Sequence, residues 1–320
     1  MKILHIKGII RAESDIMKKL VSMITAVLIV ATLFVTVPAS AKTLTYKDFE
    51  YKVSGSTVIV LKYKGSSASV TIPSKIDGKK VVKIAKTAFN KNYPNEANTT
   101  LKSVKIPDTV TAIGSAAFAK CKKLSKVTFG KNVRNIADSV FCECSSLKSV
   151  KLPDSLVKLG ECCFMTSGLK YITIPAKVRS ISVNTFDCHY LEKISVNKNN
   201  KKYSSSNGML YNKSKSKLLF CPRAIQSKTI KVSSSTRVIG TYSLFNIKNA
   251  TALRLPSKLQ KIEDFGVYLF EYRSLTVPAS VNELGINSII STSKNFTMRG
   301  KKGSAAEKYA KIYEYRFIAI

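Results

Sequence analysis

The sequence predicts an α/β repeat solenoid, a stack of similar turns that each contribute one strand to a parallel sheet. The first observation is a segment at 101–118 that returns at 124–141, 147–164 and 169–186, with spacings of 23, 23 and 22 residues. The second is the strand-like alternation that opens each copy. The third is a small-small-Phe motif near the end of each copy. A period in this range is typical of solenoids, in which each turn buries its apolar side against its neighbours.

Each copy opens with the pattern L-x-x-V-x-I-P. In the first full copy Val104 and Ile106 alternate with polar residues, which is the period of a short strand with one buried face. Pro107 then ends the strand, because proline cannot donate a ladder hydrogen bond. V-x-x-I-G follows with a second set of inward apolar residues, and Phe118 with its small neighbours predicts a tight return turn.

The period breaks after residue 191, where we expect an inserted hairpin at about 197–225. Asn207 and Gly208 form a strong turn signal, and alternation around Tyr211 and Leu219 predicts the strands. We expect an N-terminal β cap and a degenerate first repeat at 42–100, repeats at 101–295 and a C-terminal helix-strand cap at 296–320. Such caps shield the terminal turns of a solenoid.

These motifs resemble the BspA-type bacterial leucine-rich repeats. The similarity includes the repeat itself, I-P-x-x-I-D-G-K-x-V at 72–81, N-G-x-L-Y at 207–211 and G-K-K-G-S-A-A-E-K-Y-A at 300–310. The resemblance implies a right-handed leucine-rich-repeat horseshoe on a secreted or surface protein, often an adhesin. It brings no shared catalytic residues and does not identify a ligand. The sequence departs from the pattern at Val267 and Ile289, where Phe is expected, so the last turns are expected to pack differently.

Residues 1–41 have the pattern of a secretory signal peptide. Lys18 and Lys19 precede an apolar run at 20–37, and Ala39-Ser40-Ala41 forms a small-x-small cleavage site. Met17 is a more natural start than Met1. A membrane anchor is the alternative, but the cleavage site favours removal. The mature chain, residues 42–320, is therefore expected to be secreted, extracellular or associated with a bacterial cell surface, with no transmembrane span.

The chain is strongly basic. Its 53 Lys and Arg outnumber its 19 Asp and Glu, which gives a formal net charge of +34. This excess predicts either an anionic partner, such as a wall polymer, a glycan or an acidic protein, or simply a solvated surface. Nucleic acid is a weaker candidate because the chain has few aromatic residues suited to base stacking and is expected to be exported.

Catalysis has little support in the sequence, and we expect no cofactor and no enzymatic activity. A dyad of Cys188 and His189 is conceivable, but adjacent residues rarely face each other, so both are interpreted as repeat filler. Cys142, Cys144, Cys162 and Cys163 fall in neighbouring copies and could in principle hold zinc, but the spacing is not a common one. The seven cysteines are an odd number, which favours mostly free thiols over complete pairing.

The predicted concave strand face is the best candidate for a binding site. Its outward positions interleave cations with hydroxyl groups and suit an anionic glycan or an acidic protein surface. The candidate residues, which we call the strand strip, are Lys105, Lys126, Thr128, Lys151, Tyr171, Thr173, Lys193, Lys231 and Arg254.

The sequence therefore favours a secreted binding module that adheres to or recognises a host or bacterial surface protein or an anionic glycan. One alternative is a structural component of the cell surface, held on anionic wall polymer by charge. The other is a glycan-acting enzyme, which would need paired carboxylates in a cleft. Ligand identity, oligomeric state and the role of the inserted hairpin stay open at this level.

Overall fold

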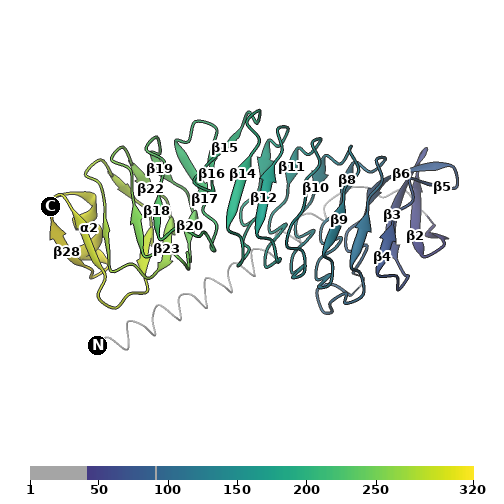
Figure 1. The fold of residues 1–320 in the computed structure, drawn as a ribbon, viewed down its shortest axis with the longest axis horizontal. Helices are drawn as coiled ribbons and strands as arrows, with labels where there is room; N and C mark the ends of the chain where they lie inside the picture. Colours follow the sequence, from purple (N-terminus) through teal and green to yellow (C-terminus); the bar gives the residue numbers. More distant parts are fainter. Residues whose placement is uncertain (1–41, 91) are drawn as a thin grey trace. The chain divides into compact units, whose positions relative to one another are not determined.

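The computed structural model describes residues 42–90 and 92–320, so the expected signal peptide lies outside the described residues. Figure 1 shows the turns of the unit Thr43–Ile320 stacked in sequence order from β2 to β28. None of the helices in these ranges is long and apolar enough to cross a membrane. The predicted repeat solenoid is confirmed.

The chain begins with an antiparallel meander of β1 (Leu44–Tyr46), β2 (Phe49–Ser54) and β3 (Thr57–Tyr63). Strand β3 pairs in parallel with β6 (Lys79–Ile84), and β5 (Lys75–Ile76) folds back on β6 through a turn at Asp77 and Gly78. The backbone φ angles of these two turn residues are 48° and 74°, the left-handed region that the Asp-Gly signal predicts. The meander starts the parallel stack.

Each turn carries two short strands, where the sequence predicted one. The V-x-x-I-G segment forms the second, because its buried Ile or Leu packs against the same position in the next turn. The strand β6 thus leads into a row made of β8 (Ala112–Ile113), β10 (Asn135–Ile136), β11 (Lys158–Leu159) and β13 (Ser180–Ile181). The glycine after it is required by close approach, since a Cβ on Gly114 would lie 2.7 Å from the backbone nitrogen of Lys86.

The first strand of each turn carries the strand strip. These strands fall into four separate sheets, whereas a single sheet was expected. Their members are β4 (Ser69–Thr71), β7 (Ser103–Lys105) and β9 (Lys126–Thr128); β12 (Tyr171–Ile174) and β14 (Lys193–Val196); β18 (Thr229–Lys231) and β21 (Ala252–Arg254); and β24 (Ser274–Thr276), β27 (Thr297–Gly300) and β28 (Arg316–Ala319). In the turn between β9 and β12, the ladder is reduced to one isolated bridge from Ser149 to Tyr171.

A column of stacked rings fills the first half of the solenoid. Phe118 and Phe141 lie 5.6 Å apart between ring centroids with their planes at 5°, and Phe141 and Phe164 lie 5.5 Å apart at 14°. The column also includes Tyr63, Phe89 and Phe186. One phenylalanine per turn thus builds a continuous aromatic core.

Cysteine recurs in this half because its thiol is a small hydrogen-bond donor at a buried backbone carbonyl. The Cys144 thiol donates to the carbonyl of Phe118 at 3.1 Å, and the Cys188 thiol donates to that of Phe164 at 2.9 Å. Both side chains are fully buried. All seven cysteines of the chain carry free thiols.

The inserted segment forms a meander of β15 (Tyr203–Ser206), β16 (Met209–Asn212) and β17 (Lys217–Phe220). Asn207 and Gly208 form its first turn with φ angles of 51° and 79°, as predicted. Met209, Leu210 and Tyr211 are buried, and the two large hydrophobic clusters of the described chain meet at this strand. The hairpin therefore braces the two halves of the core.

The second half adds a third row of strands. Strand β17 leads into β19 (Val238–Ile239), β22 (Lys261–Ile262) and β25 (Glu283–Leu284), while β20 (Leu244–Phe245), β23 (Val267–Phe270) and β26 (Ile289–Ser291) form another sheet. Val267 and Ile289 replace the expected phenylalanines, and β-branched residues favour strands. The last turns do pack differently, as the sequence indicated.

The C-terminal end consists of α2 (Ala305–Ile312) followed by β28. The Tyr309 hydroxyl accepts a hydrogen bond from the Ile289 backbone N–H at 3.0 Å and donates to the Ile289 carbonyl at 3.2 Å. The Tyr313 hydroxyl accepts from the Asn287 N–H at 2.8 Å. The helix thus brings tyrosine hydroxyls to the backbone of the last turn.

Candidate functional site

All nine residues of the strand strip are exposed. Strand register aligns many of them across turns. Lys105 lies opposite Thr128, Tyr171 opposite Lys193, and Lys231 opposite Arg254. The sequence pattern therefore identified one face of the structure correctly, although the strands beneath it belong to separate sheets.

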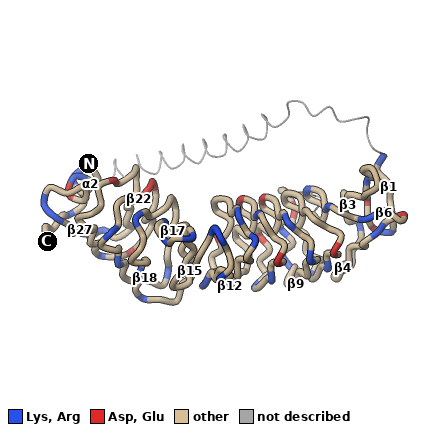
Figure 2. Tube along the Cα trace, turned by 90° about the horizontal axis from the view of Figure 1, so that it is seen from above, with Lys and Arg blue, Asp and Glu red and all other residues tan. Residues whose placement is uncertain are grey.

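The six cations of the strip are not neutralised locally. Among the described residues, none of their side chains has a carboxylate within ion-pairing distance. The Tyr171 hydroxyl donates to Glu192 at 2.7 Å, and this hydrogen bond is the main reason that the pKa of Tyr171 is raised. Figure 2 shows Lys and Arg distributed along the chain from β1 to β27, with far fewer acidic residues among them.

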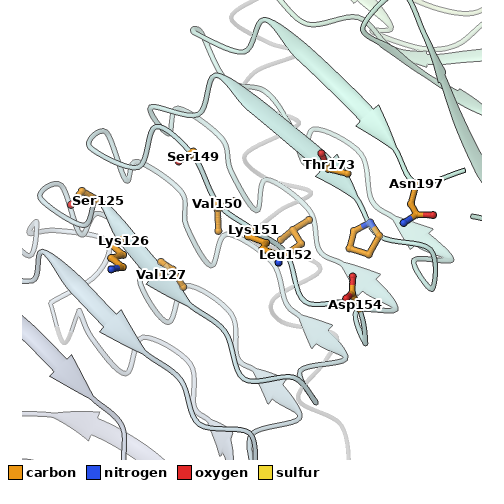
Figure 3. Close-up of a pocket in the computed structure, with 11 residues that line it drawn as sticks. Ser125, Lys126, Val127, Ser149, Val150, Lys151, Leu152, Asp154, Thr173 and Asn197 are labelled. Carbon is orange, nitrogen blue, oxygen red and sulfur yellow. The ribbon is translucent and has the colours of Figure 1, made fainter.

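A groove of about 570 Å³ opens within the strip, beside β9. Figure 3 shows Lys126 and Val127 on one side, Val150, Lys151 and Leu152 on the next turn, and Thr173 beyond them. The polar lining also includes Ser125, Ser149, Asp154 and Asn197. Three strip residues, Lys126, Lys151 and Thr173, therefore border one concave site of a size that accepts small ligands.

The groove exists because the ladder stops at β9. No backbone hydrogen bond joins 125–129 to 148–152 in the described chain, whereas the Ile106 N–H donates to Thr128 on the preceding side at 2.8 Å. Two departures from the repeat pattern lie at this point. Gly130 replaces proline and lets the backbone approach Pro107, where a Cβ would lie 2.2 Å from the carbonyl oxygen. The half-buried Phe129 stands where other turns have an aliphatic residue and packs edge-on against Phe141.

Both ends of the opening are closed by hydrogen bonds between the same two turns. The Ser146 N–H donates to the Lys122 carbonyl at 3.2 Å, and the Ser155 hydroxyl donates to the Val133 carbonyl at 2.6 Å. The second-row strands β10 and β11 also remain paired. The groove is therefore a local opening in an otherwise continuous stack.

The inserted hairpin divides the strip between β14 and β18. The Ile194 N–H donates to the Gly208 carbonyl at 2.9 Å, and the Asn207 side-chain amide donates to the Lys231 carbonyl at 3.1 Å. A smaller cavity of about 340 Å³ lies beside this turn and is lined in part by Asn207, Met209 and Lys231. Lys231 and Arg254 thus lie beyond the hairpin, separate from the other seven strip residues.

The other candidate chemistry is not assembled. Burial raises the pKa of the Cys188 thiol to about 12, and this thiol contacts the Phe164 carbonyl while His189 is exposed. Burial likewise raises the pKa of Cys121 and Cys162 to about 12 and that of Cys142 to about 11. Within 42–90 and 92–320, no three His, Cys, Asp or Glu side chains converge in a way that could hold a metal ion.

Sequence reasoning missed the groove and its residues Ser125, Asp154 and Asn197. Only two signals pointed toward it, the glycine at 130 and the phenylalanine at 129, and both had been treated as ordinary variation of the repeat. A parallel stack is expected to close on every turn, so a break in it follows from packing that the repeat pattern does not encode.

A family model for the BspA type leucine rich repeat region matches residues 83–217 and 216–301, with six copies. This chain belongs to the BspA-type leucine-rich repeat family. Its repeats account for the two-strand turns and the phenylalanine column described above. Proteins of this family are recognised by the repeat, and the match includes the strip residues from Lys105 to Arg254.

Solved structures with the same fold are bacterial leucine-rich repeat proteins. One from Bacteroides ovatus is 22% identical, with a TM-score of 0.60 over 86% of this chain and 67% of that one. One from Eubacterium ventriosum is 21% identical, with a TM-score of 0.58 over 82% and 72% of the two chains. The pneumococcal vaccine antigen PcpA is 18% identical, with a TM-score of 0.58 over 88% and 99%. No curated protein matches this chain.

Proposed function

We propose that this protein is an exported or surface-held binding module without enzymatic activity. Its ligand face is the strand strip, and its partner is an extracellular protein, an anionic glycan or a wall polymer. The observation that carries the proposal is the set of six strip cations on one exposed face, without carboxylate partners among the described residues. Charges left uncompensated at a surface favour and steer an oppositely charged partner.

Membership of a leucine-rich repeat family supports a binding role, since a stack of turns presents an extended surface for contact. The groove supports it further, because it adds a concave polar site to that surface. Hydrolysis of a glycan normally takes two carboxylates around the scissile bond. Asp154 is the only acidic residue among those that line the groove, so the groove suits binding better than glycosidic chemistry.

The test is binding of the purified protein to a panel of host matrix proteins, glycans and wall polymers at physiological ionic strength. A variant with Lys105, Lys151, Lys231 and Arg254 changed to Glu serves as the comparison. We expect at least one specific partner whose binding is lost in the variant. Equal binding by both proteins would overturn the strip as the ligand face.

A structural component of the cell surface is the second candidate, because cations also occur on many parts of the chain outside the strip (Figure 2). Such a component should remain with the producing cell and leave it in high salt, since exposed charge contacts are screened. An adhesin should instead retain one foreign partner at physiological salt. Fractionation of the producing cells, with and without a salt wash, separates the two.

A further inference from the structure

The strand strip contains two places where neighbouring strands do not pair, and the protein itself fills one of them. Between β14 and β18 lies the hairpin turn at Asn207 and Gly208. Its backbone carbonyl accepts from Ile194 on one side, and its side-chain amide donates to Lys231 on the other. A short piece of polypeptide thus satisfies both open strand edges at once.

The second place is the groove beside β9, and it is open. Strand β9 is hydrogen-bonded only to the preceding turn, and Ser149 is bridged only to Tyr171 in the following turn. The N–H and C=O groups on the facing sides of 126–128 and 149–152 are therefore directed toward the groove. Unpaired strand edges of this kind are templates for another extended chain.

The side chains around the groove indicate the chemistry of an occupant. Val127, Val150 and Leu152 contribute apolar surface, while Lys126 and Lys151 are exposed cations. Neither lysine has a carboxylate partner among the described residues, so acidic side chains are the complement. The hydrogen bonds at Ser146 and Ser155 limit the opening to a few residues.

We propose that the groove binds a short, extended, acidic peptide segment of a partner protein. The segment pairs its backbone with the open edges and its carboxylates with Lys126 and Lys151. This inference rests on the proposed function, since it specifies the partner of the same strip. Peptide is favoured over glycan because the facing groups are backbone donors and acceptors, which a peptide complements in register and which the hairpin turn already demonstrates.

A random peptide display library selected on the purified protein tests this inference. Two charge-reversed proteins serve for comparison, K126E/K151E at the groove and K231E/R254E on the far side of the hairpin. The second pair is a matched control, because it removes the same number of cations from the same strip. Thermal unfolding of both variants establishes that they are folded.

We expect acidic peptides to be enriched. Their affinity should fall at least about tenfold in K126E/K151E and stay within about twofold in K231E/R254E, because a charge contact acts at its own site. A copy of the best peptide with N-methylated backbone amides keeps every charge but loses the backbone donors. It should also bind at least about tenfold more weakly.

Several outcomes would overturn the inference. These are no enrichment, equal losses in the two variants, or equal binding of the N-methylated peptide and of heparin, which would show recognition of charge alone. A glycan from the panel whose binding is lost in K126E/K151E, with no peptide bound, would keep the proposed function and reject the peptide. If neither panel nor library yields a ligand, both proposals fail.

Discussion

The two halves of the solenoid place their aromatic rings on opposite sides of the turn. In the first half the rings of Phe118, Phe141 and Phe164 stack inside the core. In the second half the inner position is aliphatic, and half-buried rings lie outside it. There Tyr242 stacks on Phe265 at 5.1 Å, and Phe245 stacks on Tyr268 at 5.8 Å.

This difference shows that one repeat pattern can be completed by two kinds of packing. Where the inner residue is Phe, the return segment is a tight turn with left-handed residues such as Ser139 and Cys162, whose φ angles are 57° and 50°. Where it is Val267 or Ile289, the same segment becomes a strand and a third sheet forms. The size and branching of one residue per turn therefore decide how the turn closes.

The most severe test of the comparison removes one ring from the column. Phe141 is fully buried and contacts the rings above and below it, so Phe141→Ala should lower the free energy of unfolding by about 3–5 kcal/mol. Urea unfolding followed by circular dichroism measures the change. A loss under about 1 kcal/mol would mean that the neighbouring turns collapse into the space and that the column is not a rigid core.

The junction between the halves is the next test. The Arg223 guanidinium lies 2.6 Å from Asp187 and 4.3 Å from the Phe245 ring centroid, and so links both halves through the hairpin. Its side chain is 7% exposed, and burial lowers the pKa of its guanidinium despite the opposing effect of Asp187.

We expect Arg223→Ala to cost about 2–3 kcal/mol, less than a fully buried pair because the Asp187 side chain keeps 27% of its exposure. Hydrogen exchange should then show the second half opening before the first. Asp187→Asn with Arg223→Met, which leaves no unpaired charge, should recover part of the loss. Uniform exchange in Arg223→Ala would contradict a brace.

Restoring the family residue in the second half sharpens the comparison. If the aliphatic core merely lacked a ring, Val267→Phe would stabilise the protein. Because Val267 is buried and paired on both sides in the third sheet, we expect overpacking and a loss of about 1–3 kcal/mol. Thermal unfolding compares it with Val267→Ile, a smaller increase in volume. Any gain in stability from the phenylalanine would refute the idea of two distinct packings.

Alkaline pH gives a smaller effect that depends on the buried thiols of the first half. Burial raises the pKa of Cys144 well above the ordinary 9.0. Below pH 9 both the folded and unfolded thiols keep the proton, so they add no pH dependence. Above it the unfolded thiol ionises first, and stability falls by about 1.4 kcal/mol per pH unit for each such thiol until the folded pKa is reached.

Cys144→Ala should therefore flatten the decline of unfolding free energy between pH 9 and pH 10 by about that amount. Urea titrations at the two values measure the slope for the variant and the parent protein. An unchanged slope would mean that Cys144 ionises as readily in the folded protein as in the unfolded one.

Much of this structure was accessible from the sequence. The period, the strip residues, the Asn207-Gly208 turn and the terminal helix and strand follow from local patterns, because spacing and turn chemistry act over a few residues. The split of the strip into four sheets did not follow, nor did the groove and the third row of strands. These depend on contacts between turns, such as that of Gly130 with Pro107, where one residue changes how two segments about 23 residues apart approach each other.

The tyrosines at the C-terminal end determine something that no interior turn can, namely that the particle is finite. A parallel stack presents at its last turn the same backbone groups that each earlier turn offered to its successor, and an exposed row of them would recruit another chain and grow into a fibre. The hydroxyl of Tyr309 occupies both backbone groups of Ile289, and that of Tyr313 occupies Asn287. These phenols terminate polymerisation in one dimension, and they allow a basic, adhesive repeat to be made in quantity as separate molecules.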